Sequence, residues 1–122
     1  MNRQSLVRTV VLLDISDDYE NTEHVTQSLS QVAQACRVVF HRHEVIEALS
    51  ELIQSDLAKA YRLSPYAPAE EITGVPPRHQ FDDYSIYFYV TDKGKAEVRR
   101  LTAVDHPFDE NGEFRRDFCP DQ

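Results

Sequence analysis

Residues 40–64, FHRHEVIEALSELIQSDLAKAYRLS, contain the change of pattern that decides the fold. From residue 42 to residue 54, apolar side chains recur at spacings of three and four, which predicts an amphipathic helix with one buried stripe. Residues 55–56, Ser-Asp, interrupt this pattern because both side chains compete locally for backbone hydrogen bonds. From residue 57 to residue 64 the period becomes two, which predicts a half-buried strand that ends at Pro65. The stretch therefore predicts a helix that leads directly into a strand.

A second strand and three further helices are predicted around this stretch. Residues 84–91, YSIYFYVT, combine aromatic and β-branched side chains, which favours a strand. Residues 21–37 show amphipathic helical spacing, and a short helix is predicted to begin at Thr91 or Asp92. Residues 5–15 form a nearly continuous apolar run that we interpret as a buried helix, with a strand as the alternative.

Two segments are predicted to be irregular. Residues 65–83 hold four of the six prolines, and the segment is too long for a tight hairpin and too rich in proline for regular structure. Residues 105–122 spread Phe108, Phe114 and Phe118 among charged residues. We interpret them as a frayed tail, with a tail that docks its phenylalanines, for example on a second subunit, as the alternative.

The charge of the chain disfavours a polyanionic partner. The formal net charge is −8, and residues 14–56 carry nine acidic side chains but only Arg37 and Arg42 as bases. Affinity for nucleic acid depends largely on lysine and arginine contacts to phosphate. The predicted helices are therefore poorly suited to binding DNA.

Cysteine content and hydropathy predict a cytoplasmic protein. Cys36 and Cys119 are too few for a disulfide framework, and Cys36 lies on an apolar helical face, where we interpret it as a small buried hydrophobic residue. This favours a reducing compartment. No apolar run approaches the length of a transmembrane helix, so no membrane contact is predicted.

Two short strings resemble those of a known class of regulators. Residues 46–58, IEALSELIQSDLA, resemble the end of the recognition helix and the entry to the wing in MarR- and PadR-like proteins, where a run such as "ALxxLxxxGLV" is common. Asp56 replaces the usual glycine, and aspartate tolerates the left-handed conformation better than most residues. Residues 89–95, YVTDKGK, resemble the close of the wing, "YxLTxxGxxxL", in the same families.

The resemblance implies a mainly α, winged helix-turn-helix fold. It would consist of three helices, a two-stranded β-hairpin wing and a fourth helix, spanning residues 1–104 with a long proline-rich wing loop at 65–83. Residues 105–122 would form an irregular tail. Such families mostly bind DNA through the third helix, often as dimers.

The predicted outer face of the third helix is acidic, and this decides between two functional hypotheses. Guanine and phosphate require hydrogen-bond donors, whereas this face offers His43, Glu44, Glu47 and Glu51. The first hypothesis is a non-enzymatic module that binds a protein, including a second copy of itself, through these residues. The alternative is a DNA-binding transcription regulator. Its contacts would be Arg42, Lys59, Arg62, Arg78, Lys93 and Lys95.

No catalytic group, cofactor or metal site is predicted. His41 and His43 could begin a metal site or serve an enzyme, but no further ligands follow at zinc-like spacing, and at a helix start the two side chains are expected to point apart. The row of three glutamates is better explained as a solvated helix face than as catalytic carboxylates. Tyr84, Tyr87 and Tyr89 could stack bases. On a strand, however, Tyr84 lies on the face opposite Tyr87 and Tyr89, so a core residue and one exposed tyrosine pair is the simpler interpretation.

Overall fold

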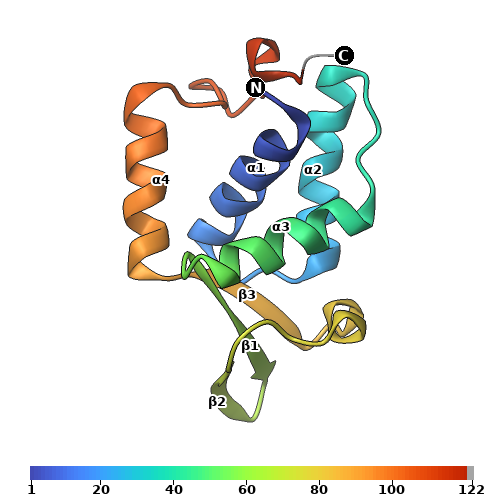
Figure 1. Cartoon of the computed structure of the whole chain (residues 1–122), viewed down its shortest axis with the longest axis vertical. Helices are drawn as coiled ribbons and strands as arrows, with labels where there is room; N and C mark the ends of the chain where they lie inside the picture. The colour runs from blue at the N-terminus through green and yellow to red at the C-terminus, as the bar shows by residue number, and fades with distance from the viewer. Residues whose placement is uncertain (121–122) are drawn as a thin grey trace.

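The computed structural model describes residues 1–120 as three helices, a small antiparallel sheet and a fourth helix (Figure 1). The helices are α1 (Arg3–Asp17), α2 (Thr22–Cys36), α3 (Arg42–Gln54) and α4 (Asp92–Val104), the strands are β1 (Ala58–Ser64), β2 (Ala67–Ile72) and β3 (Ile86–Val90), and two 3-10 turns are η1 (Arg78–Asp82) and η2 (Arg116–Phe118). This order is compatible with a winged-helix-like arrangement.

Helix α1 is the centre of the core, and the helical interpretation of its apolar run is confirmed. It packs against α2, α3, α4 and β3, and Leu6, Val11, Leu12 and Ile15 are completely buried. Because neighbours surround the helix on several sides, its apolar residues are not confined to one stripe. A sequence pattern of this kind lacks a clear period, which explains why a strand remained a reasonable alternative.

The junction between α3 and β1 follows the prediction closely. Helix α3 spans Arg42–Gln54, and the backbone N–H of His41 donates to the Glu44 carboxylate at 2.6 Å at the start of the helix. Asp56 takes a left-handed conformation with φ of 67°, as the resemblance implies. The N–H of Leu57 then donates to the carbonyl of Leu52 at 2.9 Å, which satisfies a free carbonyl at the helix end.

The sheet has three strands in the order β2-β1-β3, so the predicted two-stranded wing is wrong. Strand β2 lies inside the segment 65–83 that we predicted to be irregular, and it pairs with β1 as an antiparallel hairpin. Pro65 lies in the turn and Pro68 lies on an edge strand, where a missing N–H is tolerated. Strand β3 pairs with the other side of β1, and Glu20 forms an isolated bridge with Phe88.

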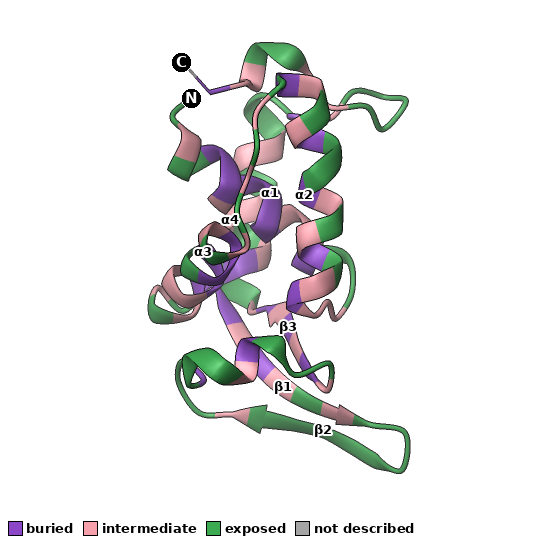
Figure 2. Cartoon of the chain, turned by 90° about the vertical axis from the view of Figure 1, so that its right-hand side faces the viewer, coloured by how far each residue is buried: buried purple, intermediate pink, exposed green. Residues whose placement is uncertain are grey.

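The hairpin of β1 and β2 extends away from the helical body (Figure 2). Five of the six residues of β2 are exposed, as is Tyr66 in the turn, whose exposed fraction is 95%. The remainder of the segment returns to the core at η1, where Phe81 is buried and stacks on Phe88 at 5.4 Å between ring centroids.

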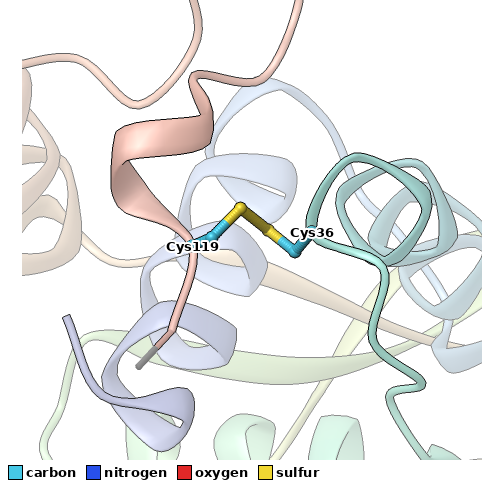
Figure 3. The surroundings of a disulfide bond; sticks show 2 residues. All are labelled: Cys36 and Cys119. Atoms are coloured by element: carbon cyan, nitrogen blue, oxygen red, sulfur yellow. A yellow bond between two sulfur atoms is a disulfide. The ribbon is translucent and has the colours of Figure 1, made fainter. Parts of the chain in front are cut away.

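The described part of the C-terminal tail is attached to the helical body, and the interpretation of Cys36 as an unpaired residue is wrong. Cys36 at the end of α2 forms a disulfide with Cys119 (Figure 3). Phe108 and Phe114 pair through an isolated bridge and pack against the core, so the frayed-tail interpretation does not describe residues 105–120.

The disulfide also bears on the predicted compartment. A disulfide is more typical of an oxidising environment, so the prediction of a reducing cytoplasm loses the observation that supported it. Among residues 1–120, no helix combines the length and apolarity that a membrane crossing needs.

Candidate functional site

The outer face of α3 is bonded to α1 by two arginines that the sequence did not indicate as partners. Arg3 donates to Glu44 through Nε at 2.6 Å and through Nη2 at 3.0 Å. Arg8 donates from Nε to Glu51 at 2.8 Å. The hydrogen bond from Arg3 lowers the pKa of the Glu44 carboxyl below its usual value. Two of the three glutamates predicted to face a partner are therefore neutralised within the chain.

Between these two ion pairs lies a hollow of about 330 Å³, which we call the α1–α3 hollow. It is lined by Arg3, Gln4, Val7, Glu44, Glu47, Ala48 and Glu51. Glu47 is exposed and forms no ion pair with any described residue. Val7 and Ala48 also line the hollow, but both are buried, with exposed fractions of 2% and 6%, so they offer only a small apolar area. This arrangement can accept a positively charged side chain whose alkyl stem covers that area.

The two histidines near the start of α3 lie together on the surface. His41 and His43 are exposed, and their rings stack with centroids 5.5 Å apart and planes 9° apart. The expectation that they point apart is wrong, because His41 precedes the helix in an extended conformation. Within residues 1–120, no group of three or more His, Cys, Asp or Glu side chains is placed to hold a metal ion.

Two of the arginines proposed as nucleic-acid contacts pair with acidic residues at the end of η1. Arg42 contacts Asp82 at 2.6 Å. Arg62 lies 3.6 Å from Asp83 and donates to the Ser85 hydroxyl at 3.2 Å. These pairs reduce the positive charge that either arginine presents to a phosphate. Arg78 is exposed on η1 and has no ion pair among the described residues.

The three proposed lysine contacts meet in a second hollow of about 480 Å³. We call it the tyrosine–lysine hollow, and it is lined by Tyr19, Asp56, Lys59, Tyr61, Tyr89, Val90, Thr91, Asp92, Lys93 and Lys95. Tyr19 stacks on Tyr89 with centroids 4.8 Å apart, and its ring meets that of Tyr61 edge-on at 5.2 Å. Sequence reasoning missed Tyr19, because it lies in the connection between α1 and α2 and belongs to no periodic pattern.

A cluster of acidic groups between α1 and α2 contains a carboxyl with a strongly perturbed pKa. Burial, with a smaller contribution from nearby Glu20, raises the pKa of Asp14 from 3.8 to about 6. The Asp14 atom Oδ2 is buried and has no hydrogen-bond partner within residues 1–120. Burial also raises the pKa of Glu20, which pairs with His24. Folding therefore shifts the protonation equilibrium of Asp14 toward the neutral acid, although a pKa of about 6 leaves the carboxyl mostly ionised at pH 7.5.

Asp14→Asn is expected to raise the free energy of unfolding at pH 7.5 by roughly 1 kcal/mol, after allowance for solvent screening of a half-buried group. The folded pKa lies above the unfolded value, so the native protein loses stability through this group as pH rises from about 4 to about 6. The difference between variant and wild type should therefore shrink below pH 4. Urea unfolding at several pH values measures this difference in the free energy of unfolding, with the exposed substitution Glu110→Gln as the charge-matched control. A difference that does not change with pH would contradict the raised pKa of Asp14.

Comparison with known proteins identifies no relative. No family model, no curated protein and no solved structure matches the chain. The likeness to winged-helix regulators accordingly rests on the order of the elements and on the two short strings at residues 46–58 and 89–95.

Proposed function

We propose that this chain is a non-enzymatic, winged-helix-like module that binds a protein through the α1–α3 hollow. The observation that supports the proposal most directly is the position of Glu47, an exposed carboxylate between two internal ion pairs and above the apolar side chains of Val7 and Ala48. The ion pairs Arg3–Glu44 and Arg8–Glu51 join α1 to α3 on the two sides of the hollow. A lysine or arginine of a partner segment, with its charged end and its apolar alkyl stem, complements this surface in charge and in polarity.

The alternative, a regulator that reads duplex DNA, has less support. Direct readout of base pairs needs hydrogen-bond donors on the helix that enters the major groove. Contact with the DNA backbone needs positively charged side chains that face the phosphates. The outer face of α3 presents Glu47, while Arg42 is bonded to Asp82. The chain has no basic residue between Arg62 and Arg78, so the exposed turn of the hairpin carries none.

Selection of a displayed peptide library on the purified protein tests the proposal. Peptides that contain lysine or arginine should be enriched, and Glu47→Arg should weaken their binding by at least about tenfold, since it replaces attraction by repulsion. Gln54→Arg, also exposed on α3 and outside the hollow, is the matched control and should leave binding unchanged. Sedimentation velocity of the same two variants shows whether a second copy of the chain is the partner.

Two results would count against the proposal. Enriched peptides that bind Glu47→Arg as tightly as wild type would place the binding surface elsewhere. Binding of mixed duplex DNA that falls steeply with salt, measured by fluorescence anisotropy, would favour the DNA-binding alternative.

A further inference from the structure

All three lysines of the chain lie around one hollow, and we propose that this tyrosine–lysine hollow binds a ligand in which a flat ring carries a phosphate, with a nucleoside monophosphate as the smallest example. Lys59 comes from β1, whereas Lys93 and Lys95 come from the first turn of α4. The surface is separate from the α1–α3 hollow, and the proposal does not depend on the proposed protein-binding function.

The ring of such a ligand has an aromatic surface to bind. Tyr61 on β1 and Tyr89 on β3 lie on the sheet face opposite the buried Ala60 and Phe88. Tyr19 packs against both tyrosines from the connection between α1 and α2, with a near-parallel interplanar angle of 20° to Tyr89. All three rings remain partly exposed. Tyrosine clusters of this kind offer a flat apolar surface on which a base can stack.

The phosphate has a cationic edge beside the same rings. The Lys95 ammonium lies 5.4 Å from the centroid of Tyr89, and Lys93 donates to the carbonyl of Ser55 at 3.1 Å. Lys59 contacts Glu71 at 2.9 Å, and an exposed ion pair of this kind contributes little, so a phosphate can replace the carboxylate. The hollow also includes Thr91, which caps the positive end of α4.

The charge balance favours a single phosphate over a nucleic-acid strand. Two carboxylates, Asp56 and Asp92, also line the hollow, and Glu71 pairs with Lys59. The three lysines are therefore balanced by three carboxylates, and an excess of one positive charge remains only when a phosphate replaces Glu71. The chain as a whole carries a net charge of −8, which repels an extended polyanion. A volume of about 480 Å³ lies within the range typical of small-molecule sites.

Titration of the ¹⁵N-labelled protein with adenosine monophosphate, adenosine and inorganic phosphate, followed by NMR, tests the proposal. The monophosphate should shift the amide signals around Tyr19, Tyr89 and Lys95, and adenosine and phosphate should each bind roughly tenfold more weakly, because each satisfies one half of the site. The shifts of the wild-type protein locate the site without any variant.

Paired variants separate the two halves of the site. Tyr19→Leu and Lys95→Gln should each lower the affinity for adenosine monophosphate by roughly fivefold or more. Tyr84→Leu and Arg99→Gln, which change exposed residues outside the hollow, should leave its affinity unchanged.

Four outcomes would overturn the proposal. Equal binding of inorganic phosphate and the monophosphate would remove the role of the rings, and equal binding of adenosine would remove the role of the lysines. Absence of shifts around the hollow at millimolar monophosphate would exclude the site. Binding of a single-stranded oligonucleotide without binding of the monophosphate would replace a small-molecule site with part of a longer nucleic-acid track.

Discussion

Replacement of both Cys36 and Cys119 by serine is expected to lower the free energy of unfolding by about 4 kcal/mol. The disulfide joins positions separated by 83 residues in the sequence, from the end of α2 to the tail. Closing so long a loop removes much conformational freedom from the unfolded chain, whereas the native contacts change little. Urea unfolding followed by circular dichroism measures the change in midpoint.

The oxidised and reduced forms of the wild-type protein provide the control for this variant. Wild type treated with a reducing agent should unfold at the same urea concentration as the double serine variant, and a reducing agent should not affect that variant. Thiol titration of the denatured, untreated protein should find no free cysteine. Identical unfolding of oxidised and reduced wild type would contradict the prediction, because it would show that the bond does not constrain the chain.

The sequence signals were strongest where structure is local. The bounds of α3 and the left-handed Asp56 follow from helical periodicity and from a residue that tolerates positive φ, both of which act within a few positions. Strand β2 gave no such signal. Because nearly all of its residues are exposed, no alternation of apolar and polar side chains marks it as a strand.

Features that depend on distant pairing could not be predicted from single-chain patterns. The bond between Cys36 and Cys119, the pairing of Arg3 with Glu44 and the meeting of the three lysines all join residues that the fold brings together. The acidic character of the outer face of α3 could be predicted from composition along the helix. The neutralisation of this acidic face by the arginines of α1 could not be predicted, because nothing in the pattern of α1 indicates which helix its arginines face.

Gly94→Ala is expected to destabilise the protein by about 3 kcal/mol, although alanine is the better helix former. Gly94 is buried in the first turn of α4, where an added Cβ would lie 2.1 Å from the carbonyl oxygen of Leu57 and 3.1 Å from the Cβ of Val90. That carbonyl cannot easily move, because it accepts a hydrogen bond from the N–H of Thr91 at 3.0 Å. The start of α4 would have to shift away from the sheet.

Gly112→Ala is the matched control for this prediction. Gly112 has φ of 78°, and no described residue lies within 4 Å of an added Cβ, so alanine there should cost only about 1 kcal/mol of backbone strain. Thermal and urea unfolding of both variants measure the difference. A smaller loss for Gly94→Ala than for Gly112→Ala would show that α4 is free to move away from Leu57, and that the close approach of helix and strand does not hold the fold together.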